Sequence, residues 1–190
     1  MSIVTDPLTR VDERPVRPRG HRGAPDLRVR PFTADDYPAA VDLVNRSFPE
    51  YGDTVDEWRF SDERRDPRVR FRRFAGELGG RLAAVASFDQ REGMYDPRRF
   101  DVDLTVDPAL RRRGIGAAMY AHLWAVLAAH DPVALHAQAR EDYTDSVRFL
   151  ERRGFRDVMR AWESRLDLAS FDPAPYAEGL ARVAASGIRV

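Results

Sequence analysis

The clearest pattern in the chain is a change of hydrophobic period near its middle. Between residues 100 and 106 every second position is apolar, and these positions are Phe100, Val102, Leu104 and Val106. A period of two predicts a strand over 100–106. From residue 115 onward the apolar positions recur every three or four residues, which predicts a helix from 116 to about 129. Asp107-Pro108 separates the two segments, so the pattern predicts a strand, a turn and a helix in that order.

The same two periods predict the other elements of the chain. Further strands are expected at 27–32, 69–74, 81–90, 133–139 and 158–168, and further helices at 34–48, 54–65, 146–153 and 172–185. Gly79-Gly80 predicts a hairpin between two of these strands. Gly154-Phe155 is typical of a helix whose last turn is closed by a glycine. Hairpin-length turns mixed with helical connections indicate an α/β fold with a mixed sheet.

Both ends of the chain differ in character from its middle. Residues 1–25 are rich in Arg and Pro and show no period, so we expect a flexible tail there. Residues 26–170 form the predicted domain, and residues 171–190 form a further helix with a short continuation. That continuation, Gly187 to Val190, is similar to residues 26–30 at the start of the domain. The similarity suggests the hypothesis that a second copy of the domain begins there.

The composition argues against several classes of function. The 31 acidic residues balance the 31 basic ones, all of them Arg, which leaves no excess charge for binding nucleic acid. No apolar run approaches the roughly 20 residues of a membrane span. The chain has no Cys for a disulfide or a thiolate, and its four His lack the spacing of a metal site, so no metal is expected. With no secretory signal at the start, we expect a cytoplasmic protein.

The turn between the strand and the helix carries three arginines and two glycines. Arg111-Arg112-Arg113 supplies positive charge and fork-shaped donors, while Gly114 and Gly116 let the backbone come close to a ligand. A helix that begins here presents unpaired N–H groups and a partial positive charge. These residues therefore suit a diphosphate. The alternative is a turn that needs glycine for its shape and whose arginines are simply solvated.

This segment resembles the cofactor-binding motif of the GNAT acetyltransferase superfamily. The motif is Arg/Gln-x-x-Gly-x-Gly/Ala, and here it is Arg111-x-x-Gly114-x-Gly116 after a strand that ends in Leu-Thr-Val-Asp-Pro. A second similar segment, 145–155, matches the closing helix of the family and ends in Gly-Phe. The resemblance covers about residues 27 to 168. It implies the acyl-CoA N-acyltransferase fold, with a six- to seven-stranded mixed sheet, about four helices and acetyl-CoA as co-substrate.

The resemblance also assigns the residues that would hold acetyl-CoA. In the family, the strand before the motif pairs through its backbone with the pantetheine arm, which implies Leu104 and Val106 here. A backbone N–H near Val106 is expected to stabilise the oxyanion that forms during transfer. The loop for the pyrophosphate would comprise Arg111, Arg112, Arg113, Gly114, Ile115, Gly116 and Ala117.

The groups that would transfer protons depart from the family pattern. Many members carry a tyrosine four residues before the glycine of the closing Gly-Phe, and here that position is Leu150. Asp101 and Asp103 lie two residues apart on one face of a strand, so repulsion between them would raise the pKa of one towards that of a general base. The alternative is that both form salt bridges with nearby arginines. Tyr143 is a candidate for the missing acid, the alternative being a packing role.

Three further residues are candidates for the acceptor site. Glu50 and Tyr51 follow the first helix, where the family usually places its acceptor loop. His136 lies on the strand of 133–139 and shares a face with Gln138, although a histidine in the core or at a sheet edge is the simpler interpretation.

Together these observations support the hypothesis of an N-acetyltransferase. It would move acetyl from acetyl-CoA to a primary amine of a small molecule or peptide by direct attack. The alternative is a non-catalytic acyl-CoA-binding or structural module of a tandem protein. We expect a monomer or a homodimer, with a second GNAT domain as a further partner, and no binding to nucleic acid or membranes.

Overall fold

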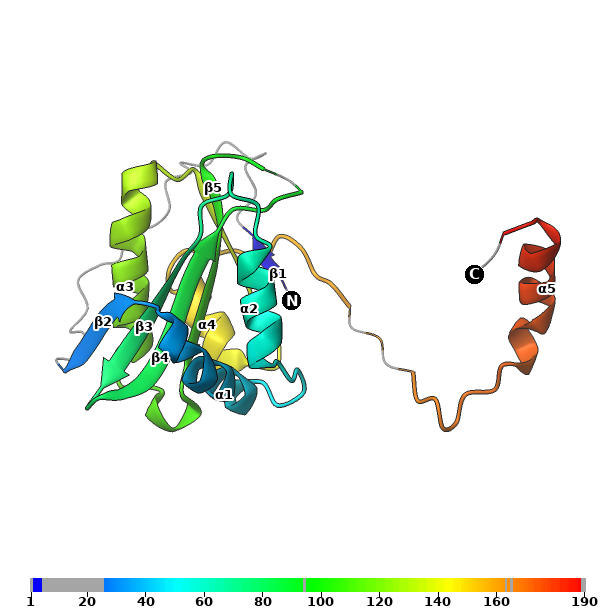
Figure 1. Cartoon of the computed structure of the whole chain (residues 1–190), viewed down its shortest axis with the longest axis horizontal. Helices are drawn as coiled ribbons and strands as arrows, with labels where there is room; N and C mark the ends of the chain where they lie inside the picture. The colour runs from blue at the N-terminus through cyan, green and yellow to red at the C-terminus, as the bar shows by residue number, and fades with distance from the viewer. Residues whose placement is uncertain (1, 5–25, 94, 163, 165, 189–190) are drawn as a thin grey trace. The chain divides into compact units, whose positions relative to one another are not determined.

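A mixed six-stranded sheet forms the framework of the protein. The computed structural model describes residues 2–4, 26–93, 95–162, 164 and 166–188. The strands are β1 Ser2–Val4, β2 Leu27–Pro31, β3 Arg72–Leu78, β4 Arg81–Asp89, β5 Arg99–Val106 and β6 Ala134–Gln138. Their order across the sheet is β1-β6-β5-β4-β3-β2, and every neighbouring pair is antiparallel except β5 and β6 (Figure 1).

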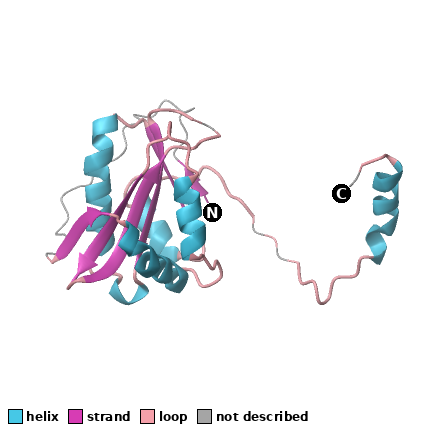
Figure 2. Ribbon diagram, in the orientation of Figure 1, coloured by secondary structure: helices cyan, strands magenta, loops and turns pink. Residues whose placement is uncertain are grey.

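Helices cover both faces of this sheet. They are α1 Tyr37–Ser47, α2 Val55–Glu63, α3 Ile115–Leu127 and α4 Thr144–Glu151. Figure 2 shows α1 and α2 in front of the strands, and α3 and α4 belong to the core on the other face. Because side chains alternate along a strand, Phe100 and Val102 of β5 point into that core. Asp101 and Asp103 therefore point to the face covered by α1 and α2.

The core on the α3 face follows the helical period predicted from the sequence. Ile115, Met119, Leu123 and Leu127 recur every four residues, and each is almost completely buried. Phe88 and Phe100 oppose them from the sheet, with ring centroids 5.7 Å apart in an edge-to-face arrangement. This packing fixes the position of α3 and therefore the position of the loop that precedes it.

Local signals set the ends of several elements as the sequence predicts. Thr54 caps α2 by accepting a hydrogen bond from the N–H of Glu57, whose carboxylate accepts one from the N–H of Thr54. The hairpin between β3 and β4 turns at Gly79 and Gly80, which both have positive φ. Gly154, with a φ of 82°, closes α4, and the N–H of Phe155 donates to the carbonyl of Leu150.

Five of the six strands predicted from the sequence are present, although β3 begins three residues later than expected. The sixth, expected at 158–168, is wrong: the described residues there form no strand beyond a single bridge at Met159. The place beside β6 is taken by β1, for which the sequence shows no pattern. Alternation shows that a segment could form a strand, but a strand also needs a neighbouring strand to pair with. Without such a neighbour, Trp162 in this segment is 83% exposed.

The start of the chain differs in part from the expected flexible tail. Ser2–Val4 pairs with His136–Gln138 of β6, while residues 1 and 5–25 lie outside the described residues. The chain divides into two compact units, residues 1–160 and 161–190. In the second unit, the predicted helix is confirmed as a short turn at Ala174–Tyr176 followed by α5, Ala177–Ala185. Among the described residues, no helix is both long and apolar enough to cross a membrane.

Candidate active site

The two parallel strands β5 and β6 separate part of the way along the sheet. Their pairing runs from Arg99 opposite Ala134 to Asp101 opposite His136 and extends no further among the described residues. The N–H of Asp107 donates towards β4, to the carbonyl of Ala83. Backbone groups alternate in direction along a strand, so those of Leu104 and Val106 point the other way, into the gap beside β6. The strand edge predicted to pair with a ligand is therefore open.

The loop after β5 is shaped by two residues in the left-handed conformation. Arg112 has a φ of 66°, and Gly114, at 82°, is the N-cap of α3. The first N–H groups of α3, from Ile115 to Ala117, have no carbonyl before them in the helix to accept their hydrogen bonds. Ile115 itself is buried in the core, so only its backbone can contribute to a site. The loop thus presents a set of N–H groups at the positive end of a helix.

Gly116 is needed for packing between helices. A side-chain carbon at this position would lie 3.2 Å from Cε2 of Phe149 in α4 and 3.6 Å from Cγ2 of Val106. The first turn of α3 therefore packs closely against both β5 and α4. This contact gives Gly116 a packing role in addition to the ligand approach predicted from the sequence.

All three arginines of the loop are exposed. Arg112 forms a long ion pair of 3.4 Å with Asp145 at the start of α4. Nε of Arg111 donates to the carbonyl of Val106 at 3.3 Å, which ties the loop back to β5. These weak, solvent-accessible contacts leave the guanidinium groups able to turn towards an anion. The residues predicted to hold a pyrophosphate are thus brought together around the start of α3 and fit that group.

Asp101 is held between two basic side chains on the face covered by α1 and α2. Nε of Arg91 donates to one of its oxygens at 2.6 Å, and Nδ1 of His136 lies 3.2 Å from the other, although poorly aligned for a hydrogen bond. Burial favours a higher pKa, but His136 and Arg91 outweigh it and lower the pKa of Asp101. The salt bridge considered from the sequence is therefore found at Asp101, with Arg91 as the arginine.

Asp103 lies in a different environment although it is two residues away. No hydrogen bond or ion pair joins it to another of the described residues. Its side chain is accessible to solvent, yet desolvation by the surrounding protein, with the charges of Asp89 and Asp101, raises its pKa to about 6. Asp103 is therefore an exposed side chain whose pKa is raised by the surrounding protein and by two neighbouring carboxylates.

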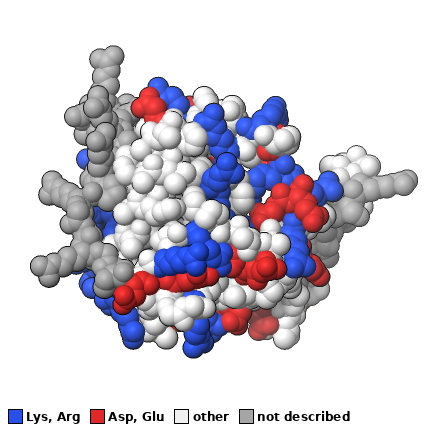
Figure 3. All heavy atoms as spheres, turned by 60° about the vertical axis from the view of Figure 1, so that its left-hand side comes forward, with Lys and Arg blue, Asp and Glu red and all other residues white. Residues whose placement is uncertain are grey.

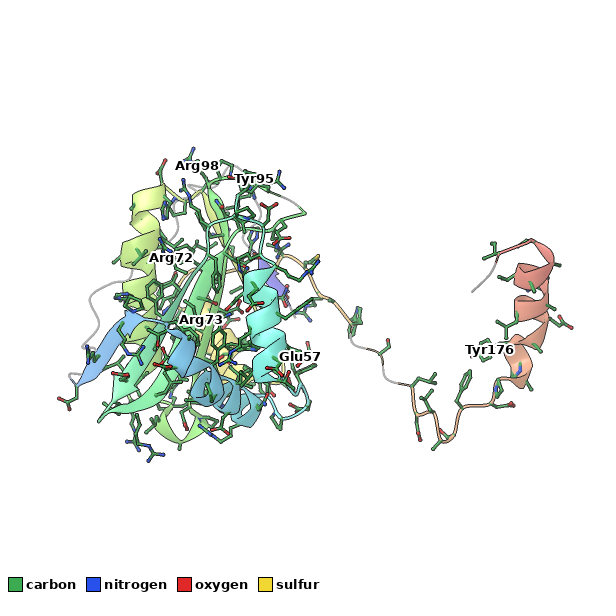
Figure 4. All side chains as sticks on the ribbon, in the orientation of Figure 1. Glu57, Arg72, Arg73, Tyr95, Arg98 and Tyr176 are labelled. Atoms are coloured by element: carbon green, nitrogen blue, oxygen red, sulfur yellow. The ribbon has the colours of Figure 1, made fainter. Side chains whose placement is uncertain are left out.

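A network of charges joins α2 to the sheet on the same face as Asp103. Arg73 of β3 forms an ion pair with Asp62 of α2 at 2.7 Å. Arg65 forms two ion pairs, with Asp62 at 3.2 Å and with Asp89 of β4 at 3.0 Å. Figure 4 shows Arg73 reaching from the sheet towards α2. Each arginine here bonds to another carboxylate, so Asp103 has no ion pair among the described residues, although the charge of Arg73 lowers its pKa in part. The sequence analysis missed the network, because it depends on where α2 crosses the sheet.

The loop after α1 and the loop after β6 meet in a second cluster. The hydroxyl of Tyr143 donates to Oε2 of Glu50 at 3.2 Å, and Arg140 forms an ion pair with Glu50 at 3.4 Å. The guanidinium of Arg140 also lies over the rings of Tyr143, at 4.9 Å, and Tyr51, at 5.8 Å. The structure thus brings Tyr143 next to Glu50 and Tyr51, although it lies 93 positions after Glu50 in the chain. The three predicted site residues surround Arg140, which the sequence analysis missed.

Comparison with known proteins identifies the family. Residues 37–155 match the sequence model of the acetyltransferase (GNAT) family. The chain belongs to the GNAT acetyltransferase family. It is 28% identical over 146 residues to phosphinothricin N-acetyltransferase from Streptomyces coelicolor, and the match covers 72% of this chain and 85% of the relative. It is 33% identical over 96 residues to mycothiol acetyltransferase from Geodermatophilus obscurus, a match covering half of this chain but only 29% of that protein.

Solved structures with the same fold support this membership. Ard1 from Thermoplasma volcanium superposes with a TM-score of 0.58 at 18% identity, covering 72% of this chain and 85% of Ard1. A tandem GNAT protein of the clavulanic acid biosynthesis pathway gives 0.59 at 23% identity, covering 80% of this chain and 50% of that one. At these identities the likeness concerns the fold. As a member of the family, the chain is an acyltransferase that uses an acyl-CoA.

Proposed function

We propose that the protein is an N-acetyltransferase that moves acetyl from acetyl-CoA to a primary amine by direct attack. The observation that carries the proposal is the position of Asp103, a carboxylate without an ion pair among the described residues and with a pKa of about 6. It is adjacent in sequence to Leu104, where the backbone of β5 opens beside β6. A proton acceptor therefore lies next to the strand edge that would hold the acyl group.

The residues of the loop fit acetyl-CoA. The N–H groups at the start of α3 and the guanidinium groups of Arg111 to Arg113 would bind the pyrophosphate. The open backbone of Leu104 and Val106 would pair with the pantetheine arm. When bound, acetyl-CoA supplies the activated acetyl group for transfer.

The two aspartates take different roles because their environments differ. An amine reaches the site mainly as an ammonium ion, which is not a nucleophile until it loses a proton. Asp103 is ionised at neutral pH but close enough to its pKa to accept that proton. Asp101 stays ionised because Arg91 and His136 stabilise its charge, so it attracts the ammonium ion without accepting its proton. Nε2 of His136 is buried and has no hydrogen-bond partner in the described part of the chain, so His136 would contact the acceptor only if the groups that cover it moved aside.

The cluster of Glu50, Tyr51, Arg140 and Tyr143 would form a wall of the acceptor site. The hydroxyl of Tyr143 already donates to Glu50, so we assign Tyr143 to positioning this wall and not to supplying a proton. The name of the Streptomyces coelicolor relative indicates phosphinothricin as its acceptor. Arg140 would suit an acceptor with an anionic group, so small amino acids and their analogues are the first acceptors to try.

A second reading of the site, as a non-catalytic acyl-CoA-binding module of a tandem protein, rests on one observation. Many members of the family have a tyrosine that serves as general acid at the position of Leu150, and Leu150 is buried in the core. The partial coverage of the tandem structure agrees with either a single-domain enzyme or one half of a pair. A cytoplasmic location remains part of the proposal, since acyl-CoA is an intracellular metabolite. So do the oligomeric state and the second domain.

Release of free thiol from acetyl-CoA in the presence of an amine tests the proposal. The chain has no Cys, so a thiol reagent sees no background from the protein. We expect turnover with some primary amines, none with tertiary amines, and a loss of about 10²–10⁴-fold in kcat in Asp103→Asn. Asp35→Asn, at an exposed aspartate, is the matched control and should retain activity. Acetyl-CoA binding without turnover for any amine would favour the non-catalytic module.

A further inference from the structure

A second concave site lies at the opposite end of α3 from the acyl-CoA loop. It is a cavity of about 300 Å³, here called the basic pocket, and it is lined by Val69, Arg70, Phe71, Arg72, Phe88 and His130. The 13 residues of α3 span about 20 Å along its axis, so the basic pocket and the loop before Ile115 are separate sites. A volume of this size suits a small molecule.

Alternation along β3 and β4 places the basic residues of the pocket on the α3 face. Phe74 belongs to the core on that face, so Arg72, two residues before it on β3, lies on the same side, and Arg70, which precedes the strand, lines the same pocket. Phe88 of β4 pairs with Arg72 across the sheet and is also in that core. Figure 4 shows Arg72 beside α3, on the other side of the sheet from the network of Arg73. The pocket therefore does not share its lining with the candidate active site.

The pocket carries positive charge that no carboxylate of the described residues offsets by an ion pair. In this chain most of the described arginines on the sheet form ion pairs, yet neither Arg70 nor Arg72 lies within 4.0 Å of a described carboxylate. Nη1 of Arg70 instead lies 2.8 Å from Nδ1 of His130, which must act as the acceptor. Figure 3 views the side of the molecule on which α3 lies and shows basic side chains beside the uncharged surface of that helix.

His130 lies close to these charges. It follows the C-terminal end of α3, where the helix dipole favours a cation. Desolvation, together with the charges of Arg70 and Arg72, nevertheless lowers the pKa of His130. The dipole amounts to about half a charge, whereas the two arginines carry two full charges, so the local potential is positive.

The pocket is held in shape by a buried amide. Gln90, which is 2% exposed, accepts a hydrogen bond from the N–H of Arg70 at 2.8 Å and donates one to the carbonyl of Pro97 at 3.0 Å. The rings of Phe88 and Phe100 pack behind the ring of His130, at 6.2 and 5.9 Å between centroids. A ligand would therefore meet basic groups whose backbone is already fixed.

We propose that the basic pocket binds a small dianion, either a phosphate group or a dicarboxylate. The two guanidinium groups and the imidazole of His130 line one pocket and provide N–H donors that such an oxyanion accepts. A dianion would neutralise the two guanidinium charges, and the aromatic floor would exclude water from one side of it. This site lies outside the proposed reaction and does not depend on acetyl transfer.

Titration with inorganic phosphate, at constant ionic strength, tests the proposal. Phosphate also has affinity for the acyl-CoA loop, so the titration is run in parallel on the native protein and on Gly114→Glu, whose loop carries a carboxylate. We expect saturable binding in both proteins, with a Kd on the order of 1 mM, and a shift of the His130 ring resonances in NMR spectra. Succinate takes the place of phosphate in the second arm, and saturation by either dianion in the pocket supports the proposal.

Matched variants decide whether the binding belongs to this pocket. Arg72→Gln should weaken it by about 10-fold or more, whereas Arg64→Gln, an exposed arginine on the face of Phe60, should leave it unchanged. The ring of His122 packs against Phe74 and serves as the internal control in the NMR spectra. The proposal is overturned if neither dianion saturates the native protein, or if Arg72→Gln binds as tightly as the native chain. Acetyl-CoA binding, measured separately, is expected to be the same in Arg72→Gln and native protein.

Discussion

Replacing Asp103 with asparagine should stabilise the protein while removing its activity. The folded protein holds the pKa of Asp103 at about 6, above its ordinary value of 3.8, because the ionised form is desolvated and repelled by Asp89 and Asp101. The native state therefore binds more protons than the unfolded state between these two values. It follows that this group's contribution to stability falls as the pH rises from about 4 to 6 and stays low above that range.

The size of the effect can be bounded from the same values. A pKa of about 6 against 3.8 corresponds to about 3 kcal/mol if the full difference acted on stability. Because the side chain is accessible to solvent, screening reduces this figure, and we expect about 1 kcal/mol. For a chain of this size, that gain raises the Tm by about 2–4 °C.

Urea unfolding of the native protein and of Asp103→Asn at pH 8 and pH 4 measures the difference directly. The variant should be more stable at pH 8 and equal to the native protein at pH 4, where the native side chain is protonated and resembles the amide. Equal stability at pH 8, or a gain of the same size at both pH values, would contradict the environment assigned to Asp103. The pH profile of kcat should rise through about 6 in the native enzyme, as expected of a base that must be ionised.

Three further predictions concern other parts of the structure. Gly116→Ala should lower the free energy of unfolding by about 1 kcal/mol, because its side chain would crowd Phe149 at 3.2 Å and the better helix propensity of Ala offsets only part of that cost; in the same urea assay Gly52→Ala, which meets nothing within 4 Å, should change little. Arg30 and Thr33 hold the pKa of Asp36 at about 2, so its contribution of about 2 kcal/mol is present above pH 3.8 and lost as the pH falls towards 2; acid unfolding of Asp36→Asn should lack that step. Tyr143→Phe should raise KM for the acceptor and change kcat less than about threefold, since its hydroxyl serves Glu50; a 100-fold fall in kcat would make Tyr143 the acid.

The sequence was sufficient for elements whose signals are local. The period of α3, the Gly79-Gly80 hairpin and the glycine that ends α4 depend on residues close together in the chain, and all three are confirmed. The strand expected at 158–168 depends on an edge of the sheet to pair with, and that information lies elsewhere in the chain. Ser2–Val4 pairs with β6 without any periodic signal, because three residues are too few to show one.

In the candidate site, too, features set by neighbouring residues were predictable from the sequence, and features set by distant contacts were not. The loop from Arg111 to Ala117 is contiguous, so its sequence was enough to bring those residues together. The distinction between Asp101 and Asp103 was not available from their shared alternation, because it depends on Arg91 reaching one carboxylate and no base reaching the other. Arg140 was missed for a similar reason: its role appears only when the loop after β6 meets Glu50.

Calorimetric titration with acetyl-CoA tests the central claim most directly. The native protein is compared with Gly114→Glu, which places a carboxylate at the start of α3, and with Gly93→Glu, at a position where a side chain meets nothing within 4 Å. We expect micromolar binding to the native protein and to Gly93→Glu, and at least about 100-fold weaker binding to Gly114→Glu. Absence of binding to the folded native protein, or equal affinity in all three, would contradict the assignment of the acyl-CoA site to this loop.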